Sequence, residues 1–371
     1  MSTASSGTYG LSSVETSGSV PAPVLSYLPP RPVRYQPKIA LIGCGGISEY
    51  HLRAYVAMGL NVVALCDRNI ARAERRRAEF FPAARVFTDF REVFAQDDIE
   101  VADIALHPAE RIAVIESALR ARKHVLSQKP FVLDLLAGGR LADLADAQNV
   151  KLAVNQNGRW APHFSYLGAA VEAGIIGDVT SIDCTLQWDH TWTAGTSFEN
   201  MHHLVLFDFG IHWFDMVTRL LGKRPARRVW ASVARIDAQR MKPPMLAQVA
   251  IDYDGAQARL DFNGHVQVGQ EDRTVICGSQ GTLRSFGPSL SEQRVSVYTA
   301  AGQATPTLEG TWFSNGFQGA MGELLCAIEE NRAPSHSARC NLASLALCFA
   351  AMASADSGLP QTPGTIHTVA K

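Results

Sequence analysis

The feature that most constrains the fold is a short apolar strand that runs into a glycine-rich turn and then a helix. The strand is expected at 38–42, and the turn that follows has the sequence GCGGIS. Gly43, Gly45 and Ser48 occupy the three small-residue positions of the pattern G-x-G-x-x-G/A. Glycine lets the backbone turn tightly and approach a pyrophosphate, which the unpaired N–H groups of the helix N-terminus bind. The stretch therefore predicts a dinucleotide-binding unit.

An acidic residue completes this pattern. Asp67 follows the next expected strand, 61–66, roughly 20 residues beyond the turn, where a carboxylate accepts hydrogen bonds from adenosine ribose hydroxyls. A carboxylate there repels a 2′-phosphate, so the sequence favours NAD as cofactor. Arg68 keeps NADP open, because a guanidinium at this position pairs with a 2′-phosphate or stacks on the adenine.

Strands and helices alternate up to about residue 155. Short strands separated by helices predict βαβ units and a parallel sheet. We therefore expect residues 36–155 to form a Rossmann domain of the α/β class. Its strands are expected at 38–42, 61–66, 85–87, 101–106, 124–127 and 151–154.

In the second half of the chain, strand-like runs follow one another with few helices between them. Asp254 and Gly255 stand between two alternating runs, which is a signal for a tight hairpin. We expect residues 156–371 to form an α+β domain with a large, mainly antiparallel open sheet, closed by two C-terminal helices. Strands are expected at 180–188, 228–235, 247–252, 256–262, 273–277, 282–286 and 294–298, and helices at 162–173, 318–331 and 341–357.

Residues 1–35 are rich in Ser, Gly and Pro, with almost no charge before Arg31. Such a segment buries too little apolar surface to offset its ordering entropy, so a disordered leader is expected. The alternative is an extended arm, Pro-rich from residue 20 to 32, laid over a partner subunit.

Charge and cysteine usage narrow the function. The chain of 371 residues has 34 Lys and Arg against 35 Asp and Glu, which leaves no global field for nucleic acid or an anionic membrane. Small neutral substrates fit better. No apolar run is long enough for a membrane span. Seven cysteines without a C-x-x-C pair are typical of reduced thiols, so a cytoplasmic location is expected.

Two stretches carry candidate chemistry. Lys129 follows the expected strand 124–127 at its carboxyl end, where ligands of α/β sheets collect, and Pro130 restricts its backbone to an extended conformation. The other stretch, 208–221, is expected to be one continuous helix.

That helix would carry four polar residues on one stripe: Asp208, His212, Asp215 and Arg219. Asp208 and His212 can form a carboxylate–imidazole pair, which fixes the tautomer of the imidazole. For Asp215 and Arg219 an i,i+4 ion pair is expected.

The ordered set GCGGIS, Asp67, QKP at 128–130, the turn at 177–178 and D-x-x-x-H-x-x-D at 208–215 resembles the Gfo/Idh/MocA family of oxidoreductases. The resemblance runs from about residue 38 to about 358. It implies a Rossmann domain followed by a domain whose open sheet forms a homodimer or homotetramer interface. It also implies oxidation or reduction of sugars, cyclitols and related polyols with bound NAD(P).

The resemblance also assigns site residues. Lys129 matches the lysine of the E-K-P motif, and Asp208 and His212 match the Asp-x-x-x-His pair, so these three are the expected catalytic residues. Gln128 replaces the usual Glu, the turn 106–108 departs from a Thr-Pro-Asn-like sequence, and Arg111 stands where His is frequent. The expected cofactor-binding residues are Gly43, Gly45, Gly46, Ile47, Asp67, Arg68, Leu106, His107, Gln128, Lys129, Asn155 and Gln156.

Hydride leaves a carbinol carbon only as the hydroxyl proton is removed, and a positioned base contributes roughly 10²–10⁴-fold. Histidine, with a pKa near ~6.5, suits this role at neutral pH, whereas lysine near ~10.4 needs a large downward shift. We therefore expect His212 to be the general base, oriented by Asp208, and Lys129 to polarise the reacting oxygen. The two roles are exchanged if cofactor charge and burial lower the lysine pKa enough.

Aromatic faces beside short polar groups suit a sugar. The expected substrate residues on this ground are Trp188, His190, Trp192 and His203, and the resemblance adds Arg159. A zinc site built from Asp189, His190, His202 and His203 is a weaker hypothesis, because adjacent histidines do not face alike and no cysteine is near, so no metal is expected.

The sequence thus predicts an NAD(P)-dependent dehydrogenase or reductase acting on a small polyol or sugar. Two alternatives use the same scaffold: a regulator that senses NAD(P) without turnover, and NAD-assisted glycoside or aldose–ketose chemistry in which the hydride is returned.

Overall fold

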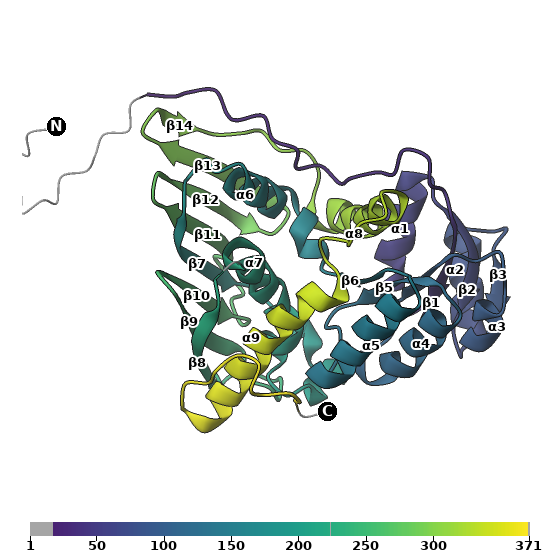
Figure 1. Ribbon diagram of the computed structural model, residues 1–371. Coiled ribbons are helices and arrows are strands. Elements are labelled where there is room, and N and C mark those ends of the chain that lie inside the picture. Colours follow the sequence, from purple (N-terminus) through teal and green to yellow (C-terminus); the bar gives the residue numbers. More distant parts are fainter. Residues whose placement is uncertain (1–17, 223, 370–371) are drawn as a thin grey trace, which may run out of the picture.

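The computed structural model describes residues 18–222 and 224–369. The chain folds into two sheets with helices packed on and between them (Figure 1). In the described part, the first sheet is parallel and has the order β3-β2-β1-β4-β5-β6. Its strands are β1 (Lys38–Ile42), β2 (Asn61–Cys66), β3 (Arg85–Phe87), β4 (Val101–Ile104), β5 (His124–Gln128) and β6 (Leu152–Asn155). This confirms the predicted Rossmann domain.

A helix stands between each strand of this sheet and the next strand in the chain. Asn69 and Asp134 cap the N-termini of two of these helices by accepting backbone N–H groups. Gly59, at φ 70°, ends another in the left-handed region. The helices are α1 (Ser48–Met58), α2 (Ile70–Phe80), α3 (Phe90–Phe94), α4 (Pro108–Arg120) and α5 (Leu135–Ala147).

The second sheet has the order β14-β13-β12-β11-β7-β10-β9-β8 in the described part and is antiparallel except for the pair β7–β10. The hairpin at Asp254–Gly255 joins β9 to β10 as predicted. Only the short β14 had no predicted counterpart. The strands are β7 (Val179–Gln187), β8 (Ala226–Ala234), β9 (Leu246–Tyr253), β10 (Ala256–Asn263), β11 (Glu271–Gly278), β12 (Gly281–Ser289), β13 (Glu292–Thr299) and β14 (Gly302–Ala304).

One face of the second sheet is covered by α6 (Pro162–Glu172), α7 (Ile211–Leu221) and part of α9 (Ala338–Ser357), as Figure 1 shows. By length and composition α9 could cross a membrane, but 61% of its most apolar stretch is buried inside the protein. It therefore fits the description of a core helix.

The remaining helix, α8 (Trp312–Glu329), packs on the first sheet. Its Phe317 and Met321 share a buried cluster with Leu41 and Tyr55 of the Rossmann domain. The nucleotide-binding layer is thus completed by a helix that the expected boundary at residue 155 assigned to the other domain.

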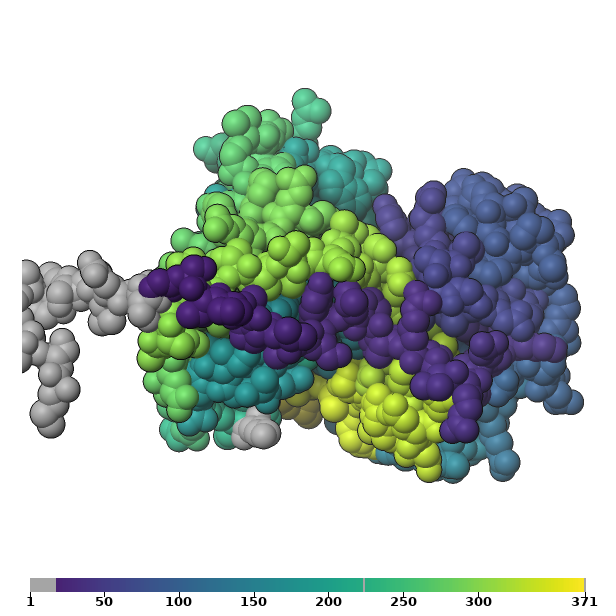
Figure 2. Space-filling model, turned by 90° about the horizontal axis from the view of Figure 1, so that it is seen from above, coloured from purple at the N-terminus to yellow at the C-terminus, as the bar shows by residue number. Residues whose placement is uncertain are grey.

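The N-terminal arm, residues 18–35, is extended and lies along its own chain (Figure 2). Its N–H at Val20 donates to the carbonyl of Gln303 in β14, and the carbonyl of Pro23 accepts from the Tyr166 hydroxyl. At its other end the Glu329 carboxylate of α8 accepts from the backbone N–H groups of residues 33–35 at 2.7 to 3.0 Å. The described part of the arm therefore contacts its own chain; the first 17 residues of the expected leader lie outside the described residues.

The stretch 208–221, predicted as one helix, is divided. A π-helical turn, η4 (Val205–Phe209), precedes α7, and Gly210 joins them. The ion pair expected between Asp215 and Arg219 is wrong, because Arg219 pairs with Glu172 at 2.7 Å. The extra residue of the π turn shifts the phase of the side chains that precede α7.

Candidate active site

A cleft of about 1000 Å³ lies along the carboxyl edge of the first sheet, where it faces the second domain. Ligands of open α/β sheets bind at this edge. Residues expected to bind cofactor or substrate that line the cleft are Gly43, Gly45, Gly46, Ile47, Asp67, Arg68, Leu106, His107, Gln128, Lys129, Trp188, His190, Trp192, Asp208 and His212. The sequence therefore located most of this cleft.

The glycine-rich turn is shaped for close approach. Gly43 has φ 98°, and a Cβ there would lie 2.7 Å from the carbonyl oxygen of Ala105. Around Gly45 and Gly46 a Cβ would meet nothing within 4 Å, so the space in front of the helix N-terminus is open. A pyrophosphate fits this concavity.

Asp67 stands at the end of β2 with both carboxylate oxygens oriented by the backbone. Its Oδ2 accepts from the N–H of Cys44 at 2.9 Å and its Oδ1 from that of Asn69 at 2.8 Å. The remaining lone pairs can accept from ribose hydroxyls. Arg68 beside it is paired with Glu110.

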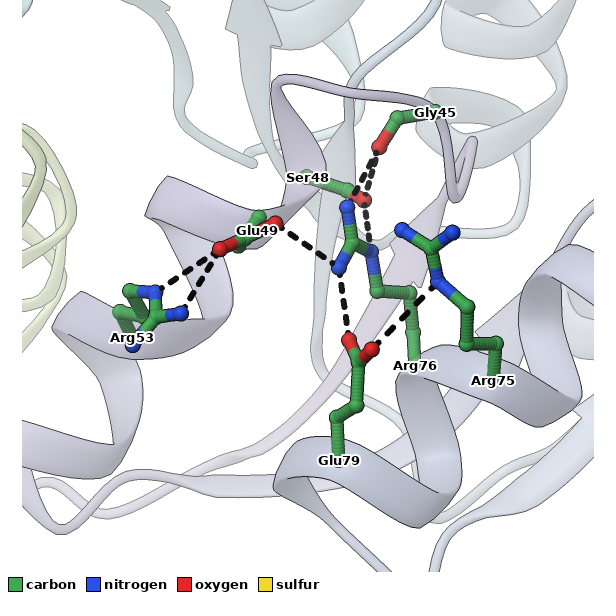
Figure 3. Close-up of polar contacts among 7 residues, drawn as sticks. All are labelled: Gly45, Ser48, Glu49, Arg53, Arg75, Arg76 and Glu79. Carbon is green, nitrogen blue, oxygen red and sulfur yellow. Dashed lines mark hydrogen bonds and ion pairs between the residues drawn. The ribbon is translucent and has the colours of Figure 1, made fainter.

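A buried arginine fixes the turn from below (Figure 3). Arg76 of α2 donates to the Ser48 hydroxyl at 3.2 Å and to the carbonyl of Gly45 at 3.4 Å. It also pairs with Glu49 and Glu79 at 3.1 and 2.7 Å. The guanidinium of Arg76 thus bonds to both the glycine-rich turn and the first turn of α1. The backbone N–H groups that would bind a phosphate are therefore already in position without a ligand.

Lys129 follows β5, and its ammonium crosses the cleft to the second domain. It donates to the backbone carbonyl of Asp208 at 2.9 Å and lies 3.2 Å from Oδ1 of the same residue. The two side chains are 15% and 13% exposed, so the pair is open to the cleft yet largely shielded from bulk water. Lys129 of the first sheet and Asp208 of the second domain therefore meet across the cleft.

His212 lies in the first turn of α7, against Gly158 and Trp312. Its Nδ1 has no hydrogen-bond partner among the described residues, so the expected bond to Asp208 is absent there, and Asp208 binds Lys129 instead. Burial, and then the positive charge of Lys129, hold the pKa of His212 well below its usual range. The imidazole is therefore neutral at physiological pH.

Arg111 holds the loop that carries Lys129. Its fully buried guanidinium donates to the carbonyl oxygens of Gln128 and Pro130, on both sides of the lysine, and to those of Leu106 and Phe131. Burial lowers the pKa of Arg111 to about 9. The charge therefore remains, and it fixes the backbone on which Lys129 stands.

A second buried network lies behind the cleft. His51 donates from Nδ1 to Asp103 at 2.6 Å, and its Nε2 faces the side-chain amides of Asn155 and Gln128 at 3.2 and 3.4 Å. Since amide N–H groups donate, His51 must accept at Nε2 and carry its proton on Nδ1. The network positions Gln128, the residue that replaces the usual Glu.

Four expected site residues do not line the cleft. Asn155 and Gln156 are 0% and 1% exposed and lie behind the cleft, so their predicted cofactor contact stays a prediction. Arg159 forms a buried ion pair with Asp215 at 2.6 Å, and His203 bonds to Asp356 at 2.8 Å, and neither side chain lines the cleft. His202 also pairs with Asp356. Among the described residues, His202, His203 and Asp356 form a group that could hold a metal ion, whereas the weaker hypothesis of a zinc site combined these two histidines with Asp189 and His190.

The cleft also contains residues that the sequence did not indicate. Several of them are aromatic. Phe209 and Trp213 lie within the stretch 208–221, whereas the others come from segments far apart in the chain. The additional lining residues include Asn157, Ser197, Phe198, Met201, Phe209, Trp213, Leu290, Trp312 and Phe313.

Comparisons with known proteins agree with this geometry. Residues 37–156 match an oxidoreductase family with an NAD-binding Rossmann fold, and residues 164–284 match the GFO/IDH/MocA C-terminal domain. D-apiose dehydrogenase of Paraburkholderia graminis is 26% identical over 339 residues, 86% of this chain and 88% of that protein. Inositol 2-dehydrogenase of Rhizobium meliloti is 25% identical over 333 residues, 85% of this chain and 96% of that protein.

Among solved structures, an oxidoreductase from Agrobacterium radiobacter in complex with NAD+, L-tartaric acid and magnesium has a TM-score of 0.80. It is 24% identical and covers 89% of this chain and 99% of its own. Fold, cleft and family matches together define an oxidoreductase that binds a nicotinamide dinucleotide on its Rossmann domain. The chain belongs to the GFO/IDH/MocA family.

Proposed function

We propose that this protein transfers a hydride between a nicotinamide cofactor and a CH–OH group of a sugar, cyclitol or related polyol. One observation carries the proposal: Lys129 of the nucleotide domain and His212 of the second domain line the same cleft, with Asp208 bonded to the lysine. The names of the curated relatives, an apiose and an inositol dehydrogenase, support the substrate class.

The roles of the residues follow from their charges. When bound, the nicotinamide ring supplies the hydride acceptor or donor. Neutral His212 takes the hydroxyl proton in oxidation and returns it in reduction. Lys129 donates a hydrogen bond to the reacting oxygen, and Asp208 holds the ammonium in place through its carbonyl and carboxylate. The exchanged assignment gives the proton transfer to Lys129 and the hydrogen bond to His212.

NAD is the proposed cofactor rather than NADP. The carboxylate of Asp67, held by two backbone N–H groups, suits ribose hydroxyls and repels a 2′-phosphate. Asp67→Ala should raise the Kd for NAD about tenfold, the loss of a hydrogen bond to a charged group, and lower that for NADP. Asp143→Ala, on the surface, is the matched control. Tighter NADP than NAD binding by the unchanged protein contradicts this choice.

We further propose a homodimer or homotetramer in the cytoplasm. The face of the second sheet away from the helices, on the left in Figure 1, carries exposed Phe286 on β12, Arg273 on β11 and Arg259 on β10. A mixed polar and aromatic face of this kind suits an interface between identical subunits. All seven cysteines are free thiols, which suits a reducing compartment. Light scattering on the purified protein tests the subunit count.

The decisive experiment is a spectrophotometric screen for NADH and NADPH formation with sugars, inositols, anhydrosugars and glycosides. Reduced cofactor should form with at least one of them. NAD binding without any turnover would favour the sensing regulator. Glycoside consumption without net NADH would favour chemistry in which the hydride is returned.

A further inference from the structure

We propose, on the basis of the function above, that the substrate is a neutral sugar or cyclitol with an aromatic or other apolar substituent, rather than a free or acidic sugar. The substituent would lie along one wall of the cleft. We define this aromatic wall as Trp312, Trp213, Trp188, His190, Trp192 and Phe198.

The aromatic wall is continuous from the catalytic centre to the solvent. It begins at His212, whose ring centroid lies 5.3 Å from that of Trp312. The following contacts, Trp312–Trp213, Trp213–Trp188 and Trp188–His190, join centroids at 5.8, 5.4 and 5.2 Å. Beyond these, His190 lies 6.3 Å from Trp192, which lies 5.5 Å from Phe198.

Burial changes along this wall. Trp213 and Trp312 are almost completely buried, whereas Trp192 is 56% exposed. The two inner indoles are covered by their neighbours and close the inner end of the cleft next to His212, so the sugar ring would lie between them and Trp192. Trp192 and Phe198 then lie beyond that ring, at the mouth of the cleft. An apolar side chain exposed at the rim of a binding cleft is typical of a surface that a ligand covers.

The charges of the cleft argue against an acidic substrate. Lys129 is neutralised by Asp208, and the guanidinium of Arg111 is used by backbone carbonyls. Arg159, which could have bound a carboxylate, is paired with Asp215 outside the cleft. Among the described lining residues, the other arginines, Arg68 and Arg72, belong to the adenosine end beside Asp67.

Few polar groups remain for the hydroxyls of a free sugar. Apart from Lys129, Asp208 and His212, the substrate half of the cleft offers Ser197, Asn157 and the ring nitrogens of the aromatic wall, and the Asn157 oxygen already accepts from the Trp312 indole at 2.8 Å. His190 is stacked on Phe209 at 3.9 Å, and burial lowers its pKa to about 4, so it adds no charge. A hydroxyl buried without a partner weakens binding. Replacing one of the hydroxyls by an apolar substituent removes that cost and covers the wall.

The test measures binding by calorimetry with saturating NADH, which prevents oxidation of the ligand during the titration. The probes are D-glucose, methyl β-D-glucopyranoside, phenyl β-D-glucopyranoside and phenyl β-D-glucuronide, with the matching xylose and galactose series. In the best series we expect the phenyl glycoside to bind at least about tenfold more tightly than the methyl glycoside, as for one apolar group in a fitted pocket. The phenyl uronide should bind more weakly than the neutral phenyl glycoside.

Two variants at one position identify the wall. Trp192→Ala should lower the phenyl-to-methyl affinity ratio about tenfold, whereas Trp192→Phe, which keeps an aromatic face, should retain most of it. Equal affinities for phenyl and methyl glycosides, a ratio unchanged by Trp192→Ala, or preferred binding of the free sugar or the uronide would each overturn the inference. This test measures binding and not turnover. Failure of all compounds to yield NADH would refute the proposed function, whereas the affinities measured by calorimetry would still decide the inference about the substituent.

Discussion

The ammonium of Lys129 is bonded twice to Asp208, to its backbone carbonyl at 2.9 Å and its carboxylate at 3.2 Å. The lysine comes from the nucleotide-binding sheet, and the aspartate from a π-helical turn of the second domain. The contact therefore joins the two halves of the molecule at the atoms proposed to meet the substrate. It also explains why Asp208 does not orient His212 as the sequence suggested.

Lys129→Ala should lower kcat by about 10²–10⁴, because both the hydrogen bond to the reacting oxygen and its charge are lost. His212→Ala should have an effect of similar size. The Kd for NAD should stay nearly unchanged in both. Steady-state kinetics and cofactor titration measure these values, with Lys151→Ala on the surface as the control. Near-normal turnover in both variants would remove the assignment.

Arg111→Lys tests whether the loop that carries Lys129 is held by the guanidinium. The single ammonium of the introduced side chain cannot reach the carbonyl oxygens on both sides of Lys129. Lys129 should therefore move from its position in the cleft. We expect kcat to fall by up to about 10²-fold, as for a misplacement near 1 Å, and the free energy of unfolding to fall by about 3 kcal/mol. Arg120→Lys, exposed on the same helix, should change neither. An unaltered kcat would show that the loop keeps its position without Arg111.

Acid should destabilise the fold through buried neutral histidines. Burial lowers the pKa of His163 to about 3, whereas in the unfolded chain it is near 6.5. Below pH 6.5 the unfolded chain therefore takes up a proton that the folded chain excludes, and stability falls as the pH falls. From pH 7 to 5 this one group costs about 2 kcal/mol.

His163→Phe removes this proton uptake. Denaturant unfolding at pH 7 and 5 should show a smaller loss of stability in the variant than in the parent, by about the same 2 kcal/mol. A parallel loss in both proteins would mean that His163 is protonated in the folded state.

Glu329→Ala should release the C-terminal end of the arm. The three backbone N–H groups that donate to its carboxylate hold the pKa of Glu329 below its usual range, and without it they have only water as partner. Hydrogen exchange at Val33, Arg34 and Tyr35 should accelerate, and limited proteolysis should cut the arm sooner. Glu330→Ala, next to it, is the control; equal protection in both variants would show that the apolar contacts of the arm suffice.

The first domain could be predicted almost residue by residue, because each of its strands is short, apolar and bounded by a helix of clear periodicity. β1, β2 and β3 have the predicted bounds. Lys129 and His212, which local motifs mark in the sequence, both line the cleft, and their catalytic roles stay a prediction.

The errors share a physical cause. A π turn inserts a residue without a sequence signal, so Asp208 was given the wrong partner. Arg159 and His203 have the right chemistry for a sugar site, but their carboxylate partners, Asp215 and Asp356, are distant in the chain. Such ion pairs between distant parts of the chain decide which polar side chains face the cleft. The periodicity of the sequence does not predict them. The aromatic pair at the start of α8 was missed for the same reason.

The arm, residues 18–35, and α8 connect the two domains, and this bears on how the substrate enters the cleft. The arm is bonded to β14 at one end and to α8 and the loop before β4 at the other, and α8 itself is packed on the first sheet. These contacts of the arm and α8 resist a hinge rotation that would move the two domains apart. The segment 189–203, which lines the cleft, carries only short 3₁₀ turns. We therefore expect substrate binding and product release to depend on local movement of this segment rather than on a rotation of one domain against the other.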